Sequence, residues 1–450
     1  MKRKIISAKK LRLGIAAAFM IFGSTSVFAQ QQISLQEAIK QALQNKSEAK
    51  KASLQIKKAE AKIDEARAGA LPHVTATAGL TYNPIIQESL LEFGGQKIRA
   101  QLGQPWNSSA SVQVQQAIFD QRVFTGLKAA KSTREFYILN AQLTNEQLIE
   151  NVATAYYQVF VQEENLRTIN ESFTNTEKVR KVIKSLVDNG LAKKIDLDRT
   201  DVRLTNVSSS KQTIINGLEL SKNALKFYMG IPIETDITLE QKEIQPRPEL
   251  LASTLDVKNR SEIKVLEKNR ELLQYNKKAT EAYLYPTVRL VGNYGWGATG
   301  AKFPLTNGLN NGVLWSDYSA IGLNVNIPIF TGGSTKSKIA QAQMDIDDLD
   351  LDIENTQLSL NLDYKNAITN MENALINIES MENNLTLAEK VRADTESNYR
   401  YGLATLTEVL DADNALTQAK QNHANALLDY KQAEIKLIKA KGELNTLQNP

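Results

Sequence analysis

The chain has 450 residues, 42% hydrophobic and 23% charged, with a formal charge of +4, a composition unlike that of a disordered chain or a helical membrane protein. It has no cysteine, which excludes disulfide scaffolds, thiolate zinc sites, thiol nucleophiles and cysteine-linked lipid anchors. With only two histidines, His73 and His423, it is a poor candidate for a multi-histidine metal centre or an imidazole-dependent enzyme, and we expect no cofactor.

Residues 1–29 have the pattern of a secretory signal peptide. They hold six basic and no acidic residues, an apolar stretch from Leu13 to Phe22, and a small-residue cleavage site at Val27-Phe28-Ala29. The apolar stretch is shorter than the ~20 residues of a membrane-spanning helix, so we expect cleavage after Ala29. Taking these six from the 54 basic residues leaves 48 against 50 acidic ones, a net charge of −2 without electrostatic support for nucleic-acid binding.

The elements that follow come in one order, which is then repeated. A helix opened by a possible capping box at Ser34 and Glu37 leads to a strand, a polar loop, a second strand, a very long helix, a glycine turn and a returning helix. In the first half these are predicted at 34–68, 74–82, 83–107, 110–115, 122–188, Gly190 and up to Gly230. In the second half they are predicted at 261–282, 288–296, 297–317, 321–327, 335–400, Gly402 and up to Gly442.

The predicted strands are apolar on one face and carry Thr, Gln or Asn on the other, the pattern of barrel strands around a wet lumen. Tyr82, Tyr294 and Trp296 lie near strand ends, where an interfacial aromatic girdle is expected. The same alternation also fits the edge of a soluble β-sandwich. Since no later segment has the length of an apolar spanning helix, we expect a closed barrel with extracellular loops at 83–107 and 297–317. Four strands are too few to close, so several chains must contribute.

Two sequence motifs recur at one spacing. Glu177-Lys-Val-Arg180 returns 212 residues later as Glu389-Lys-Val-Arg392, and Gly190-Leu-Ala192 returns as Gly402-Leu-Ala404. We therefore predict a tandem duplication, with units at 30–230 and 257–442, a connector at 231–256 and a tail at 443–450. The long helices have the alternating three- and four-residue apolar spacing of coiled coils. Each would run on the order of 100 Å, a length that suits a tube, a stalk or a bundle.

Four segments carry a family resemblance: Ser34–Leu43 (SLQEAIKQAL), Gln116–Asp120 (QAIFD), Glu163–Leu166 (EENL) and Tyr401–Ala412 (YGLATLTEVLDA). With them the chain resembles the TolC-like outer-membrane efflux protein family over nearly its whole mature length. The resemblance implies an α+β membrane protein of the Gram-negative outer membrane. It further implies a homotrimer with one twelve-stranded β-barrel, four strands per chain, continuous with a long periplasmic α-helical coiled-coil barrel.

The resemblance also implies a function without chemistry of its own. Such trimers dock onto a periplasmic adaptor (membrane fusion) protein and an inner-membrane transporter. They form the exit duct of a tripartite efflux pump or a type I secretion system for drugs or other substrates. Two other function classes stay open on sequence alone: a coiled-coil stalk or adhesin, and a periplasmic adaptor, although no lipoyl-like β-domain is present.

The family's periplasmic entrance maps onto one predicted helix start. The resemblance places Glu408 and Asp411 at the acidic ring that narrows the entrance, where aspartate is usual at the first position. The two lie on one helix face, and three copies would bring six carboxylates together to favour cations. On the residues alone, both fit equally well as first-turn acids that stabilise a helix N-terminus after Gly402.

A lock on the entrance is implied by four further positions. Tyr399 and Asp196 match residues that help to keep the entrance shut in relatives, whereas Ala404 replaces the expected arginine. Lys193 or Lys194, on the other turn, would be the substitute.

The glycine turns match the tips that contact adaptor hairpins. These are Gly190 with Leu191 and Gly402 with Leu403. The alternative, equally open on sequence, is a plain helix–turn–helix glycine with an apolar contact.

Overall fold

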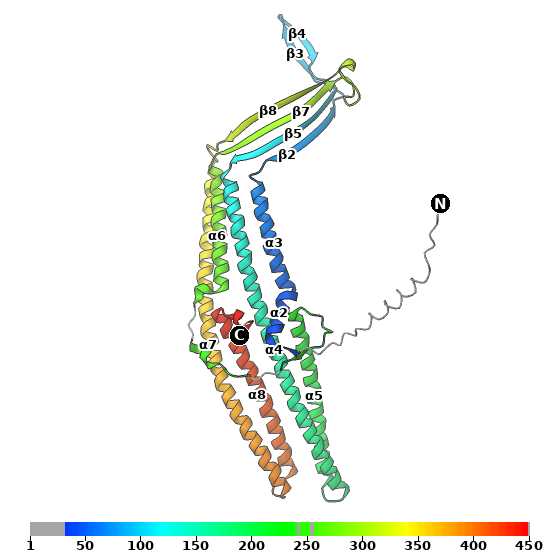
Figure 1. Ribbon diagram of the computed structural model, residues 1–450, viewed down its shortest axis with the longest axis vertical. Helices are drawn as coiled ribbons and strands as arrows, with labels where there is room; N and C mark the ends of the chain where they lie inside the picture. The colour runs from blue at the N-terminus through cyan, green and yellow to red at the C-terminus, as the bar shows by residue number, and fades with distance from the viewer. Residues whose placement is uncertain (1–31, 241–243, 253–255, 449–450) are drawn as a thin grey trace, which may run out of the picture.

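The computed structural model describes residues 32–240, 244–252 and 256–448, so the predicted signal peptide lies outside the described residues. The molecule is elongated, with a sheet at one end and antiparallel helices running from it to the other end (Figure 1). Among the described helices, none combines the length and apolar character needed to cross a membrane.

Four long strands form an antiparallel sheet in the order β2-β5-β7-β8. They are β2 (His73–Tyr82), β5 (Trp106–Phe119), β7 (Thr287–Gly300) and β8 (Val313–Asn326). Three of them extend well beyond the predicted segments, and the second loop shrinks to residues 301–312. Within the described residues, β2 and β8 each pair on one side only, so the sheet has two free edges.

The register places apolar residues of all four strands on one face of the sheet. Val74 faces Val114 across the first pair, Val114 faces Gly292, and Gly292 faces Ile321. Because side chains alternate along a strand, the residues two positions away share this face. Ile321 is 86% exposed, so this apolar face is not covered by the rest of the chain.

A second hairpin stands beyond the end of the sheet (Figure 1). Strands β3 (Glu88–Phe93) and β4 (Gln96–Gln101) pair with each other around Gly94-Gly95. The prediction of a polar loop over 83–107 was therefore wrong for its centre.

Two very long helices confirm the prediction for each half. They are α4 (Gln121–Asp188) and α7 (Ser334–Arg400), and the returning helices are α5 (Lys194–Met229) and α8 (Leu406–Lys441). The coiled-coil spacing of α7 points inward, since Ala342, Ile346 and Leu349 are buried. Helices α3 (Ser47–Ala68) and α6 (Ser261–Glu281) pack on the sheet-proximal halves of α4 and α7. Five 3₁₀ turns lie at Pro248–Ala252, Val257–Asn259, Ala282–Leu284, Leu309–Asn311 and Leu444–Leu447.

The predicted single helix over 34–68 is in fact two. Helix α2 (Leu35–Asn45) ends at Lys46, whose φ of −65° and ψ of 138° are extended, and α3 then begins. Lys46 Nζ donates to the carbonyl oxygen of Phe227 at the end of α5, 2.9 Å away. At the start of α2 only half of the expected capping box forms: the Glu37 N–H donates to Ser34 Oγ, while the Glu37 carboxylate accepts from Gln41.

The second half repeats this contact. Arg260 precedes α6 with φ −64° and ψ 136°, and its guanidinium donates to the carbonyl oxygen of Lys439 at the end of α8. In each half a basic side chain thus satisfies a carbonyl that a helix C-terminus leaves open.

The apolar core lies midway along the helices. It joins α2, α4, α5 and α8 through residues such as Ile39, Ile149, Leu225 and Ile438. Strands β1 (Gln32–Ile33) and β6 (Thr238–Leu239) pair in parallel beside it, and the Tyr156 hydroxyl donates to the carbonyl oxygen of Ile33. This core fixes the helices and leaves their distal ends to be held by other contacts.

Candidate functional site at the helical tips

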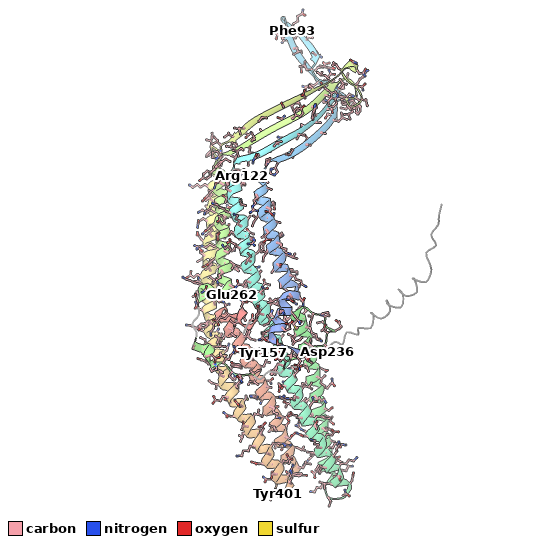
Figure 2. All side chains as sticks on the ribbon, in the orientation of Figure 1. Phe93, Arg122, Tyr157, Asp236, Glu262 and Tyr401 are labelled. Atoms are coloured by element: carbon pink, nitrogen blue, oxygen red, sulfur yellow. The ribbon has the colours of Figure 1, made fainter. Side chains whose placement is uncertain are left out.

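Two turns form the end of the molecule farthest from the strands. Figure 2 shows Tyr401 at this end and Phe93 at the other. Both turns close in the same way, since the Leu191 N–H donates to Leu186 O at 2.7 Å and the Leu403 N–H donates to Asn398 O at 2.8 Å. Gly190 and Gly402 take the left-handed conformation that this closure requires, with φ of 71° and 75°.

The leucines of the tips are not used in packing. Leu191 is 76% exposed and Leu403 is 78% exposed. The glycines therefore serve as ordinary helix ends, but the apolar contact that usually accompanies such turns is not made. Two exposed leucines remain available at the tips of a single chain.

Glu408 is engaged within its own helix. Its carboxylate accepts from the Thr405 N–H at 2.6 Å, and the Glu408 N–H donates to Thr405 Oγ1 at 3.3 Å, which completes a capping box at the start of α8. These hydrogen bonds hold the pKa of the Glu408 carboxyl below its usual value. Asp411 lies exposed nearly one turn further along α8. In the single chain Glu408 thus has the helix-start role that the sequence left open.

Tyr399 and Asp196 lie close enough to interact. Burial, and then the charge of Asp196, raise the pKa of the Tyr399 hydroxyl. Tyr399 comes from the end of α7 and Asp196 from the first turn of α5, so both turns contribute. Lys193 and Lys194 are exposed at the start of α5.

Two arginines that the sequence analysis did not single out join α5 to α8. Arg199 Nη1 donates to Thr407 Oγ1 at 3.1 Å, and Arg203 Nη1 donates to Asn414 Oδ1 at 2.9 Å. They lie just inside the tips, beside the predicted lock residues.

Asp413 joins four helices at the same level. Its carboxylate accepts from Ser172 Oγ of α4 at 3.4 Å and lies 4.0 Å from Arg392 of α7. Burial raises the pKa of Asp413, while the charges of Arg392, Arg203 and Lys420 oppose that rise. Asp413 is thus a partly desolvated charge held among cations from α5, α7 and α8.

The repeated tetrapeptide carried a signal for this cluster. Arg392 is the counterpart of Arg180, and Arg180 pairs with Asp201, which lies 212 residues before Asp413. Both halves therefore place the last arginine of the repeated motif against an aspartate of the returning helix.

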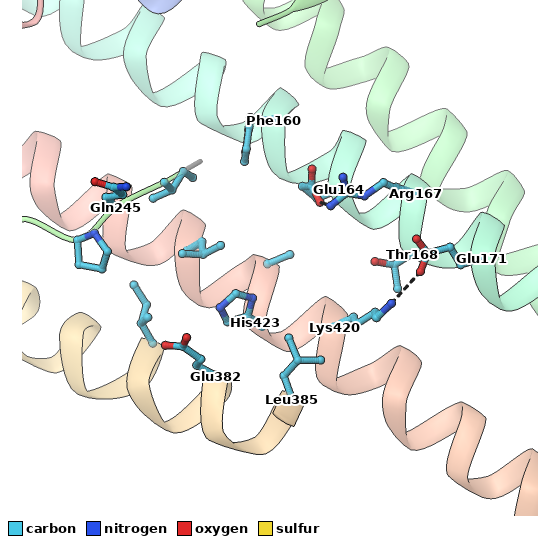
Figure 3. A pocket seen from close by; sticks show the side chains of 15 residues that line it. Phe160, Glu164, Arg167, Thr168, Glu171, Gln245, Glu382, Leu385, Lys420 and His423 are labelled. Carbon is cyan, nitrogen blue, oxygen red and sulfur yellow. Dashed lines mark hydrogen bonds and ion pairs between the residues drawn. The ribbon is translucent and has the colours of Figure 1, made fainter. Parts of the chain in front are cut away.

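A cavity of about 590 Å³ lies between α4, α7, α8 and residues 244–246 (Figure 3). Its lining mixes apolar side chains with charged ones, and Lys420 pairs with Glu171 at 2.7 Å. His423 also lines it. In the part of the chain that the structure describes, no three His, Cys, Asp or Glu side chains are grouped to hold a metal ion.

Comparisons with known proteins agree on one family. The family model described as "Outer membrane efflux protein" matches residues 38–230 and 255–443. The chain is 25% identical over 427 residues to outer membrane protein TolC of Escherichia coli K12, covering 91% of this chain and 82% of that protein. It is 23% identical over 445 residues to TolC of Vibrio cholerae, covering 97% and 96%.

Solved outer-membrane channels share the fold. VceC of Vibrio cholerae aligns with a TM-score of 0.70 at 20% identity, over 91% of this chain and 96% of that one. The open state of MtrE of Neisseria gonorrhoeae aligns with a TM-score of 0.69 at 20% identity, over 91% and 88%.

Proposed function

Because this chain belongs to the outer membrane efflux protein family, we propose that it is the exit duct of a tripartite efflux pump or a type I secretion system. Its place in the outer membrane and its role in transport follow from that membership. In the proposed role it passes drugs or other substrates outward, catalyses no reaction, and works with a periplasmic adaptor and an inner-membrane transporter. A stalk, an adhesin or an adaptor would leave the sheet without a purpose.

One observation carries the proposal: a four-stranded sheet with two free edges and an exposed apolar face continues into helices of 68 and 67 residues. Strands β2 and β8 run in opposite directions, so β8 of one copy can pair with β2 of the next in the same antiparallel manner. Three copies would give a closed barrel of twelve strands with its apolar face toward lipid. The helices would then form a periplasmic tunnel.

The two halves are proposed to be a tandem duplication, with units at 30–230 and 257–442 joined by residues 231–256. Support comes from the contacts that recur at the same spacing. Lys46 and Arg260 bind equivalent carbonyls, and Arg180 and Arg392 lie against equivalent aspartates. A duplicated chain would let three copies build a ring with six similar sectors.

Topology can be tested by thiol labelling, because the native chain has no cysteine. Asn310→Cys lies in the 301–312 loop and Leu191→Cys lies at a tip, and both native residues are exposed. An impermeant maleimide should label only the Asn310→Cys variant on whole cells and both variants after the outer membrane is permeabilised. Unheated electrophoresis should show a trimer. Labelling of Leu191→Cys alone on whole cells would refute the topology.

The tips are proposed to be the periplasmic entrance. Glu408 and Asp411 from three copies would form its acidic ring, and Asp196, Tyr399 and Lys193 or Lys194 would help to lock it. The exposed leucines, Leu191 beside Gly190 and Leu403 beside Gly402, would contact the adaptor. The proximity of Asp196 to Tyr399 supports the lock, whereas the cap at Glu408 requires an experiment that separates charge from helix capping.

Two variants make that separation. Glu408→Gln with Asp411→Asn removes the charges but keeps an N3 side chain that can complete a capping box, whereas Glu408→Ala with Asp411→Asn removes both. If the acids form a ring, both double variants should weaken trivalent-cation block of single-channel current and lower the preference for cations. Unchanged block in the Gln variant, together with loss of function only in the Ala variant, would leave Glu408 as a cap alone.

A further inference from the structure

The hairpin β3–β4 is an amphipathic element with no packing partner of its own. Leu91 is paired with Ile98, and Phe93 lies two residues after Leu91, so these three side chains share one face. Glu92 is paired with Lys97 on the opposite face, where Leu90 and Arg99 also lie. Phe93 is 80% exposed, and Leu91 and Ile98 are exposed as well.

An isolated two-stranded hairpin is marginally stable in water. An exposed apolar face on such a hairpin indicates a surface that it covers in the assembled protein. The hairpin stands away from its own sheet (Figure 1), so that surface belongs to another molecule.

The edges of the sheet indicate which molecule this is. The hairpin follows Tyr82 at the end of β2, and β2 is a free edge. When β2 pairs in antiparallel fashion with β8 of a neighbouring copy, the end of β2 lies beside the start of that β8. The start of β8 is Val313, directly after the 301–312 loop. The hairpin of one copy therefore begins next to the 301–312 loop of its neighbour.

The 301–312 loop offers an ordered apolar platform. Phe303 stacks edge-on against Trp106 with 5.1 Å between ring centroids, and Trp315 Nε1 donates to the carbonyl oxygen of Pro304 at 3.2 Å. These contacts hold the loop on its own sheet. Leu305 is 64% exposed and Leu309 is 73% exposed, and both remain uncovered in the single chain.

We propose that in the trimer the apolar face of the hairpin, formed by Leu91, Phe93 and Ile98, packs on the 301–312 loop of the neighbouring copy. The inference rests on the trimer of the proposed function. The reach is sufficient, since six residues of strand span about 20 Å and neighbouring strands lie only about 4.8 Å apart. Three such contacts would join the extracellular rims of the three copies beyond the barrel itself.

Disulfide cross-linking tests the contact in the full-length chain. Leu91→Cys combined with Leu309→Cys, under a mild oxidant, should give covalently linked dimers and trimers on denaturing gels. The matched control is Leu90→Cys with Leu309→Cys, because Leu90 is the preceding residue and lies on the opposite face. The control should cross-link at least tenfold less.

Each other outcome is decisive. Unheated trimers without cross-links, equal cross-linking of both pairs, or a disulfide within one chain would overturn the contact while leaving the proposed channel intact. Protection of the Leu91→Cys thiol by lipid in place of the Leu309→Cys thiol would assign the hairpin to the membrane surface and also overturn it. Absence of trimers in every variant, with the wild type included, would refute the trimer itself.

Trypsin gives a second readout that needs no disulfide. Lys97 and Arg99 lie in β4, so docking of the hairpin should slow cleavage there. Leu91→Asp with Ile98→Asp should speed that cleavage at least tenfold in intact trimers, whereas Leu90→Asp should change it little. Equal rates in the wild type and the double variant would contradict docking.

Discussion

Gly230 and Gly442 end the returning helices of the two halves, and substitution by alanine should affect them very differently. Both have positive φ, 69° and 77°. A Cβ on Gly230 would lie 2.8 Å from the backbone nitrogen of Lys46 and 2.9 Å from the carbonyl carbon of Asn45. A Cβ on Gly442 would meet only the flexible Arg260 side chain at 3.4 Å. The same substitution thus adds a backbone clash in one half only.

The two costs can be worked out separately. Alanine in the left-handed region costs about 1 kcal/mol in either half. Overpacking against atoms that cannot rotate away adds about 2 kcal/mol at Gly230. Gly442→Ala should therefore destabilise its junction by about 1 kcal/mol and Gly230→Ala by about 3 kcal/mol. The difference corresponds to about a 30-fold change in an opening equilibrium.

Amide hydrogen exchange on the assembled protein measures this locally. The Lys50 N–H donates to Lys46 O across the first junction, and the Lys264 N–H donates to Arg260 O across the second. Protection at Lys50 in Gly230→Ala should fall about 30-fold further than protection at Lys264 in Gly442→Ala. Equal losses at the two amides would show that the close approach at Lys46 does not constrain the fold, and would refute the reasoning.

Three further predictions concern capping and charge. Because hydrogen bonds from Arg122 lower the pKa of Asp120, which caps α4, the charged form favours folding, and that contribution is lost as pH falls below the usual aspartate range; Asp120→Asn should flatten the loss of chemical-denaturation midpoint between pH 5 and 2, and Asp120→Ala should cost about 1 kcal/mol more by removing the cap. Because burial raises the pKa of Asp413, the opposite sign holds, and stability relative to Asp413→Asn should fall as pH rises from the usual aspartate pKa through the raised folded one; a flat difference would contradict it. Thr405→Ala removes the cap that holds Glu408 and should destabilise the start of α8 by about 1 kcal/mol, seen as faster exchange of its first amides, whereas Thr407→Ala should leave the cap intact.

Much of the fold could be predicted because its signals are long and periodic. The two long helices begin and end within one residue of the predicted bounds, at Gln121 and Asp188 and at Ser334 and Arg400. Glycine ends such as Gly190 and Gly402 are readable because only glycine takes the left-handed conformation without strain. The strands were predicted too short because Ser108 and Ser109, which extend β5, interrupt the apolar alternation.

Other features follow from contacts between distant segments. The break at Lys46 has no glycine or proline to announce it, since it depends on the approach of Gly230 and Phe227. The contacts of Arg199 and Arg203 depend on how α5 is rotated against α8, which no local pattern encodes.

Two local signals were present but were read differently. Gly94-Gly95 between two short runs is a hairpin signature, although the surrounding segment was interpreted as a polar loop. The Thr405 to Glu408 spacing matches a capping box, although the family resemblance directed attention to the acidic ring.

The continuity of α4 and α7 has a mechanical consequence. Sharp helix kinks need proline, glycine–serine pairs or insertions in the hydrogen-bond ladder, and neither helix contains proline. The single glycine of α4, Gly126, lies in its second turn, and α7 has none. Each helix therefore behaves as an elastic rod from the strands to the tip, whereas the helices beside them are jointed at Lys46 and Arg260. A displacement of the tip would be spread as gentle curvature over the whole rod, and the joints would let the flanking helices slide to follow it.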